Sequence, residues 1–405
     1  MARGRRDSDL ERLSQSPTDP GFVQNPYAFY RAARALGDFV YWEDYGMAMA
    51  TTHEAVTRVL KSKKMGREVP LDRRRPIRPG LEPFYDVEAH SMLELEPPRH
   101  TSLRQLVLRA FTRNRISRLA PDISMIADDL MDTFPDGPFD LLDVYARPLP
   151  VIVIARLLGV PESMAPQLLT WSNDMVAMYQ SRRTVEIEDR AAAAAGAFSD
   201  FMRGYVEKRR STPGNDLISE LIAAEQDGEK LSLDELISTC ILLLNAGHEA
   251  TVHSIGNAVR HLAGHARCIE AMQPERIEYA VEECLRFDPP LHMFTRHVYE
   301  PVDIMGTHFK PGDEVGCLLG SACRDDAIWP DGDRFDPFRD IVKNTAFGAG
   351  IHFCVGAPLA RLELQIALPA LFSRFPNLQI AEPTKVADLY HFRGLERLMV
   401  NVASP

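Results

Sequence analysis

Several features are missing from this sequence, and each absence excludes a class of protein. No run of about 18 or more apolar residues occurs, so no transmembrane helix is expected. Residues 1–10 are charged and lack the apolar core of a secretion signal. We therefore expect a cytoplasmic protein with no membrane partner.

The cysteines lack the pairing that metal sites and disulfide frameworks need. No C-x-x-C pair occurs, which argues against zinc, and without a secretion signal a disulfide framework is not expected. Most of them are expected to be small core residues. Only the last has neighbours that suggest reactivity. The six are Cys240, Cys268, Cys284, Cys317, Cys323 and Cys354.

The chain also has fewer basic than acidic residues. The chain has 46 Lys and Arg against 57 Asp and Glu, giving a net charge of −11. No standard nucleic-acid motif accompanies this balance, so no nucleic-acid partner is expected. A local basic patch remains possible.

The order of patterns along the chain predicts a mainly α fold with a small β region. Residues 1–20 resemble a loose tail, and residues 61–90 are rich in proline and basic residues, which predicts a long loop. Residues 99–286 are mostly helical in pattern. Short strand-like runs lie at residues 39–41, 46–51, 297–302, 313–319 and 398–402.

One predicted helix is unusually long. Ser232 and Glu235 form a capping box, the apolar pattern runs to about Leu262, and Gly264 offers a stop. The helix would have about 31 residues and a length of about 47 Å. Its centre, residues 242–251, mixes small side chains with a carboxylate. Taken alone, these small side chains favour tight packing against another helix, and the alternative is that they let a flat ligand approach the backbone.

The most informative segment surrounds Cys354. Gly348, Gly350 and Gly356 permit tight turns and close approach of the backbone to a ligand. Backbone N–H groups near the sulfur, and the N-terminus of the apolar helix that follows, would stabilise a thiolate. From the spacing alone, a buried structural cysteine in a glycine-rich turn is an equal alternative.

The segment resembles the haem-binding signature of the cytochrome P450 family, Phe-x-x-Gly-x-x-x-Cys-x-Gly, at Phe347, Gly350, Cys354 and Gly356. Further matches appear in the family's order over about residues 20–402. They comprise the Glu-x-x-Arg pair Glu283 and Arg286, the arginine that completes that triad, Arg334, the oxygen-binding groove Ala246-Gly247-His248-Glu249, and the early-helix motif His100-Thr101-x-x-Arg104.

The resemblance implies one triangular cytochrome P450 domain over residues 21–405, with the long central helix over haem b. Cys354 would be the iron ligand, whose thiolate favours O–O cleavage. The residues expected to hold the haem propionates are His100, Arg104, Arg296 and His352. Those expected to border the haem elsewhere are Phe347, Gly348, Gly356 and Ala246.

The resemblance also implies a monooxygenase that hydroxylates or epoxidises a small organic substrate with O2. No NAD or flavin site is visible, so electrons would come from a ferredoxin and its reductase. Two alternatives are a peroxygenase that uses hydrogen peroxide and a non-catalytic haem sensor or electron carrier. The face expected to dock the ferredoxin contains Arg104, Arg109, Arg113, Lys343 and Arg361.

The sequence does not identify the substrate. By resemblance, the side chains that face it are Leu242, Asn245, Ala246, His292, Phe294 and Phe392. Asn245 and His292 are polar where apolar residues are common, which favours a substrate of moderate size with an oxygen function. The alternative is that both bond to backbone or water.

The catalytic residues expected on the long helix are Gly247, Glu249, Ala250 and Thr251. Most family members have a threonine after the acid, but here Ala250 has no proton to relay. One step along a helix is a rotation of about 100°, so Thr251 should point elsewhere. Glu249 could pass protons through water, helped by a substrate hydroxyl, or a kink could bring Thr251 into range. The first route is favoured.

Overall fold

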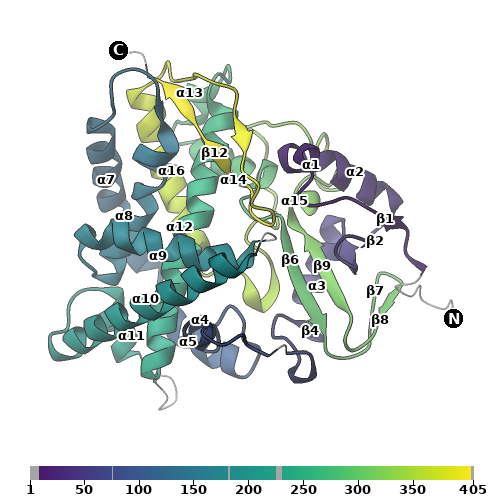
Figure 1. Cartoon of the computed structure of the whole chain (residues 1–405). Coiled ribbons are helices and arrows are strands. Elements are labelled where there is room, and N and C mark those ends of the chain that lie inside the picture. Colours follow the sequence, from purple (N-terminus) through teal and green to yellow (C-terminus); the bar gives the residue numbers. More distant parts are fainter. Residues whose placement is uncertain (1–8, 75, 181–182, 225–229, 403–405) are drawn as a thin grey trace. The chain divides into compact units, whose positions relative to one another are not determined.

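The structure is a computed structural model that describes residues 9–74, 76–180, 183–224 and 230–402. Helices dominate and the strands are short, as predicted (Figure 1). The chain divides into two compact units, and each is assembled from separated segments. Unit 1 comprises residues 1–74, 257–354 and 383–397, and unit 2 comprises residues 75–256, 355–382 and 398–405.

Unit 1 contains most of the β structure. Its helices are α1 (Pro20–Gln24), α2 (Tyr27–Leu36), α3 (His53–Lys61), α13 (Cys268–Ala271), α14 (Ile277–Phe287) and α15 (Leu319–Ala322), with 3-10 turns η2 (Leu71–Arg73) and η6 (Gly350–His352). The strands are β1 (Arg12–Leu13), β2 (Phe39–Trp42), β3 (Met47–Ala50), β4 (Met65–Gly66), β6 (Met293–Val298), β7 (Val302–Ile304), β8 (Thr307–Phe309), β9 (Glu314–Leu318), β11 (Lys385–Val386) and β12 (Leu395–Arg397).

A six-stranded sheet in the order β1-β2-β3-β9-β6-β4 organises unit 1. Helix α3 packs on it, because its apolar residues Val56, Val59 and Leu60 recur at helical spacing and are buried in one cluster with Ala50 of β3 and Val315 of β9. Burying each large aliphatic side chain contributes roughly 1.5–3 kcal/mol. The C-terminal end of α3 is thereby fixed.

Unit 2 is mostly helical. Its helices are α4 (Glu82–Glu88), α5 (Arg99–Ala110), α6 (Arg113–Ser117), α7 (Ala120–Asp132), α8 (Pro148–Leu158), α9 (Ala165–Val176), α10 (Val185–Ser211), α11 (Leu217–Ala223) and α16 (Ala357–Arg374), with the short turns η3 (Leu142–Ala146), η4 (Glu162–Met164) and η5 (Ala177–Tyr179). A three-stranded sheet joins β10 (Gln379–Ile380), β13 (Met399–Asn401) and β5 (Phe139–Asp140).

The predicted long helix is confirmed as α12 (Leu233–Leu262), with 30 residues. The capping box is also present: Glu235 N–H donates to Ser232 Oγ at 3.2 Å, and Ser232 N–H donates to the Glu235 carboxylate at 2.9 Å. Gly264 has φ +78°, which fits the predicted stop. Residues 233–256 of α12 belong to unit 2 and residues 257–262 to unit 1.

Two local predictions were wrong. The expected tail contains β1, which pairs with β2, and Trp42 Nε1 donates to Gln15 O at 2.7 Å, so residues 9–20 are held in place. Residues 1–8 lie outside the described residues. The expected loop at 61–90 contains α4. Pro83 is compatible with this helix because it lies in the first turn, where backbone N–H groups have no acceptor within the helix.

The strand-like runs were predicted more accurately. The strands that overlap the expected residues are β2, β3, β9 and β13. The strand expected at 297–302 instead begins four residues earlier in the sequence. There β6 begins at Met293 and pairs with β9 along its length. The expectation of a single domain over 21–405 stays a prediction.

Candidate active site

The loop that ends at Cys354 is closed by its own backbone. Cys354 N–H donates to Phe347 O at 3.0 Å, and Phe353 N–H donates to Gly350 O at 3.2 Å. Gly350 has φ +75°, and a Cβ there would collide with the carbonyl oxygen of Leu60 at the end of α3. Only glycine satisfies both conditions, which explains this position of the motif.

Cys354 differs from the other five cysteines in exposure. All six lie in the described part of the chain, and Cys354 is partly exposed whereas the rest are buried. Burial raises the pKa of Cys240 and Cys317 to about 12 and that of Cys268 to about 11, so these remain thiols. A partly exposed cysteine at the end of a glycine-rich loop fits an iron ligand better than a buried structural cysteine.

β6 passes beside this loop. A Cβ at Gly348 would lie 3.6 Å from the ring of Phe294, so this strand residue packs on the loop. Arg296 is two residues further along β6 and therefore projects from the same face. It is 2% exposed. Unit 1 thus contains Cys354 and two of the predicted propionate partners, Arg296 and the half-buried His352 in η6.

The other two predicted propionate partners lie on α5 in unit 2. His100 and Arg104 are four residues apart, which places them on one face of that helix. His100 is 2% exposed and Arg104 is partly buried.

The buried ion pair predicted from Glu-x-x-Arg is present in unit 1. Arg286 donates to both carboxylate oxygens of Glu283, at 2.6 and 2.7 Å, and to the carbonyls of Cys323 and Gly332. Both side chains are 2% exposed. This pair fixes α14 to the segment that follows β9.

The third member of this triad was predicted wrongly. Arg334 is exposed and contributes its backbone carbonyl, which accepts from Arg286 at 3.3 Å and from Arg339 at 3.1 Å. The guanidinium that approaches Glu283 belongs to Arg339, with Nε 3.5 Å from the carboxylate. The turn at residues 331–334 directs the Arg334 side chain outwards. Both arginines lie in one loop, so the sequence could not distinguish them.

The centre of α12 has one face that is not buried. Four residues on this face are partly or fully exposed within a mostly buried stretch, and their helical spacing places them side by side: Leu242, Ala246, Glu249 and Ala250. An uncovered stripe of small and apolar side chains in mid-helix fits a flat cofactor and an apolar substrate. Gly247 has another reason to be small, because a Cβ there would lie 2.6 Å from Ile154 Cδ1 on α8.

Asn245 lies off that stripe. It is 8% exposed, and its Nδ2 lies 3.6 Å from Met175 Sδ on α9. Its Oδ1 has no hydrogen-bond partner among the described residues. Sequence reasoning did not identify Met175, because nothing in its local pattern indicates what faces it.

Glu249 and Thr251 make different contacts on α12. Glu249 Oε1 lies 3.0 Å from His253 Nε2. Thr251 Oγ1 donates to Gly247 O at 2.8 Å, within a helix that is continuous from Leu233 to Leu262. These observations favour the water route over a kink that would make Thr251 the relay. The spacing of four between Glu249 and His253 was a usable sequence signal that was missed.

His292 is not placed as predicted. It is fully buried in unit 1, with Nδ1 3.0 Å from the hydroxyl of Tyr30 and Nε2 3.3 Å from that of Tyr27. Burial lowers its pKa well below the ordinary value, so the ring is neutral. Both nitrogens have protein partners, which departs from the expected substrate contact. Phe392 is partly buried and forms an isolated bridge with Leu291.

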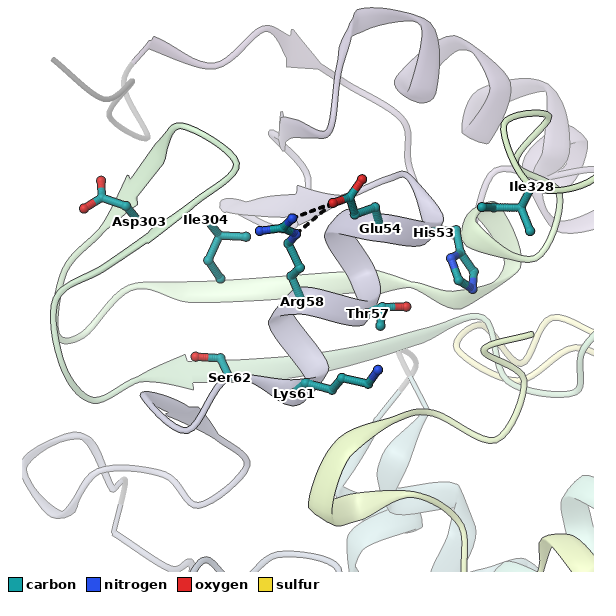
Figure 2. Close-up of a pocket in the computed structure, with 9 residues that line it drawn as sticks. All are labelled: His53, Glu54, Thr57, Arg58, Lys61, Ser62, Asp303, Ile304 and Ile328. Carbon is teal, nitrogen blue, oxygen red and sulfur yellow. Dashed lines mark hydrogen bonds and ion pairs between the residues drawn. The ribbon is translucent and has the colours of Figure 1, made fainter. Parts of the chain in front are cut away.

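An open hollow in unit 1 lies elsewhere. Figure 2 shows this open hollow of about 620 Å³ beside α3, with the Arg58–Glu54 ion pair at 2.6 Å on its wall. The residues that line it are His53, Glu54, Thr57, Arg58, Lys61, Ser62, Asp303, Ile304 and Ile328. None of the predicted site residues is among them, so this hollow is not the candidate active site.

The comparisons with known proteins agree with these features. The family model described as "Cytochrome P450" matches residues 23–279 and 276–396. "Cytochrome P450 107B1" of Saccharopolyspora erythraea is 41% identical over 330 residues, 80% of this chain and 79% of that protein. "Cytochrome P450 monooxygenase PikC" of Streptomyces venezuelae is 40% identical over 313 residues, which cover 75% of this chain and 74% of that protein.

Solved structures show the same likeness. The crystal structure of P450BioI in complex with an acyl carrier protein ligated to hexadec-9Z-enoic acid has a TM-score of 0.88 and 33% identity, covering 95% of this chain and 100% of that one. The chain belongs to the cytochrome P450 family. It is a cytochrome P450 monooxygenase with the family's mainly α fold and haem cofactor. Among the described residues, no helix is long and apolar enough to cross a membrane.

Proposed function

We propose that the protein inserts one oxygen atom from O2 into a small organic substrate, by hydroxylation or epoxidation, with electrons from a ferredoxin and its reductase. One observation carries this proposal. Cys354 is partly exposed, and it ends a loop in which position 350 accepts only glycine. Haem bound there would supply dioxygen activation. A cytoplasmic location is part of the proposal.

Turnover tests this function. The protein, loaded with haem, would be assayed with a ferredoxin, a ferredoxin reductase, NADPH and O2, and separately with hydrogen peroxide alone. We expect oxygenated product only with the electron-transfer system. Product with peroxide alone would make the protein a peroxygenase, and no product from any spectrally binding compound would favour a sensor or electron carrier.

The remaining residues of the site would position the cofactor. Charge-assisted hydrogen bonds to a propionate contribute about 1.5–3 kcal/mol each. The side chains proposed for this role are His100, Arg104, Arg296 and His352. Those proposed to border the ring are Phe347, Gly348, Gly356 and Ala246. A crystal structure of the loaded protein with these side chains remote from the cofactor would contradict the assignment.

The substrate would lie against an apolar surface. Leu242 and Ala246 on the uncovered stripe of α12, together with Phe294 and Phe392, are proposed to contact it. The unpartnered Oδ1 of Asn245 can accept one hydrogen bond, which favours a substrate with a hydroxyl or amide N–H. His292 is not retained for this role. Substrate-induced spectral shifts with Asn245→Leu test the idea, since unchanged affinity and regiochemistry would remove Asn245 from the pocket.

Glu249 would deliver protons. Ala250 leaves space for a water molecule, and a water bridging the Glu249 carboxylate to backbone carbonyls would have the partners it needs. The hydroxyl of Thr251 is already bonded to Gly247 O. Glu249→Gln should therefore slow turnover and Thr251→Ala should change it little. Strong uncoupling by Thr251→Ala alone would reverse the assignment.

The electron donor would be an acidic protein. Arg109, Arg113 and Lys343 are exposed, and Arg104 and Arg361 partly so, in a chain whose net charge is −11. These basic side chains would steer an acidic ferredoxin. Arg113→Glu and raised ionic strength should both lower the rate of reduction. A rate insensitive to both would place docking elsewhere.

A further inference from the structure

Three titratable side chains gather on α12 around one carboxylate. His253 Nε2 lies 3.0 Å from Glu249 Oε1, and His248 Nδ1 lies 3.8 Å from Glu249 Oε2. The side chains are 7%, 17% and 2% exposed for His253, Glu249 and His248. Among the described residues, no group of three or more His, Cys, Asp or Glu side chains could hold a metal ion, so we do not interpret this cluster as a metal site.

The charge state of Glu249 depends on its neighbours. Burial alone would raise its pKa, but the contact with His253 and the nearby His248 and Arg147 lower that pKa to about 2. His248 behaves oppositely, because burial lowers its pKa to about 4 against the pull of Glu249. At neutral pH Glu249 is a carboxylate and His248 is neutral. Arg147 is itself paired with Asp143.

The hydroxyl groups of Thr251 and Ser254, on the same stretch of α12, donate their protons to backbone carbonyl groups. Thr251 Oγ1 donates its proton to Gly247 O at 2.8 Å, and Ser254 Oγ donates its proton to Ala250 O at 2.8 Å. Ala250 has a methyl group where a hydroxyl would be needed. The acid–base side chains left on this turn are therefore Glu249 and His253, whose Oε1 and Nε2 atoms lie 3.0 Å apart.

We propose that His253 is a positioning residue for Glu249 that also supplies its protons, so that the His253–Glu249 pair replaces the hydroxyl relay missing at position 250. In its imidazolium form His253 would pass the Nε2 proton to Glu249 Oε1 and become neutral. The resulting carboxylic acid would release this proton through water towards the uncovered stripe of α12. His253 then takes a proton from solvent, so the pair ends each cycle unchanged. The inference rests on the proposed role of Glu249.

The spacing supports this division of labour. Positions 249 and 253 are four residues apart on an unbroken helix, so the two side chains stay neighbours in any rotation of α12. The carboxylate lies on the uncovered stripe with Ala246 and Ala250, whereas the imidazole is buried behind it. The carboxylate can therefore reach a ligand on the stripe, and the histidine acts through it.

The first test measures coupling in the holoenzyme. His253→Asn should lower the product formed per electron pair by about tenfold and increase peroxide release, since general acid catalysis contributes at least that much. His253→Lys restores a cation with N–H protons within reach of Glu249 and should recover part of the coupling. Ser254→Ala, one residue away, is the matched control and should behave like the wild type.

The second test does not depend on turnover. With 13Cδ-labelled glutamate and the diamagnetic ferrous carbon-monoxide form, the Glu249 signal is identified by its loss in Glu249→Gln. We expect no titration of Glu249 between about pH 8 and about pH 5 in the wild type, but the onset of titration in that range in His253→Asn, where the buried carboxylate has lost its partner. If the His253 side chain did not interact with the Glu249 carboxylate, the substitution would leave this signal unchanged.

The outcomes separate the two proposals. If Glu249→Gln leaves coupling intact, the proposed role of Glu249 fails and this inference fails with it. If Glu249→Gln uncouples the enzyme but His253→Asn does not differ from Ser254→Ala, only the role of His253 is overturned. An identical titration of Glu249 in wild type and His253→Asn would also overturn it. Haem content and the reduced carbon-monoxide spectrum verify that each variant folds.

Discussion

Arg339 Nε lies 3.5 Å from the carboxylate of Glu283, a carboxylate that Arg286 already binds with two hydrogen bonds. One buried carboxylate thus serves two guanidinium groups, and a third bond comes from Asp336 N–H at 2.9 Å. The network joins α14 to the loop at residues 331–340. The hydrogen bonds from Arg286 and Asp336 to the Glu283 carboxylate are what make the burial of these charges tolerable.

Removing Arg286 from this network should therefore be severe. Arg286→Met leaves Glu283 buried without its main partner and is expected to cost about 3–5 kcal/mol of unfolding free energy. Arg339→Met should cost less, about 1–3 kcal/mol, because its distance is longer and its side chain is partly exposed. Urea unfolding measures both.

The matched control for Arg339 is Arg334. Its side chain is exposed and only its backbone carbonyl contributes, so Arg334→Met should change stability by less than about 0.5 kcal/mol. A larger loss from Arg334→Met than from Arg339→Met would restore the assignment made from the sequence.

Cys354→Ser should abolish the red-shifted Soret band of the ferrous carbon-monoxide complex, because that band requires a thiolate ligand. Cys268→Ala, at a cysteine that is 8% exposed, should keep the band at full intensity. The measurement is the reduced carbon-monoxide difference spectrum at equal protein concentration. A red-shifted band in Cys354→Ser would show that another cysteine binds the iron.

Gly350→Ala should prevent the Cys354 loop from closing. The added Cβ would meet Leu60 O, a backbone atom at the end of a packed helix, and the φ of +75° is already unfavourable for alanine. We expect haem incorporation to be lost. Gly264→Ala has φ +78° but open space around its Cβ, so it should cost only about 1 kcal/mol and keep the haem. Equal haem content in the two variants would contradict the packing argument.

Glu363 on α16 predicts a pH dependence of stability. It is 1% exposed, its Oε1 has no hydrogen-bond partner among the described residues, and burial raises its pKa to about 8. The folded state therefore holds a proton that the unfolded state loses above an ordinary pKa of 4.5. This group's contribution is present at low pH and is lost as pH rises towards about 8.

Glu363→Gln mimics the protonated acid at every pH. Relative to this variant, the wild type should lose about 3 kcal/mol of unfolding free energy between about pH 5.5 and about pH 8. Urea unfolding at the two pH values measures the difference. A gap between the two proteins that does not change with pH would mean that Glu363 is ionised in the folded state.

Elements whose signals are local were predicted well. The capping box of Ser232 and Glu235 fixed the start of α12 within one residue, because the cap and the apolar period are both properties of neighbouring residues. The glycine at position 350 was likewise identified by its neighbours. The partial exposure of Cys354, beside five buried cysteines, agrees with the motif.

Contacts across large separations were predicted less well. Arg334 and Arg339 lie in one loop, and only the turn between them decides which reaches Glu283. His292 was assigned to the substrate, but its nitrogens meet Tyr27 and Tyr30, more than 260 residues earlier in the chain. No local pattern carries such information.

The sequence by itself determined the family, the cysteine proposed to bind iron and the absence of a hydroxyl at position 250, because each is a property of contiguous residues. Only the tertiary structure decided that the side chain of Arg339, and not that of Arg334, approaches Glu283, and that the ring of His292 meets Tyr27 and Tyr30. Side-chain partners depend on rotamers and on which groups burial leaves without water. A buried polar group must find a partner within about 3 Å, and that choice is made by packing rather than by sequence order.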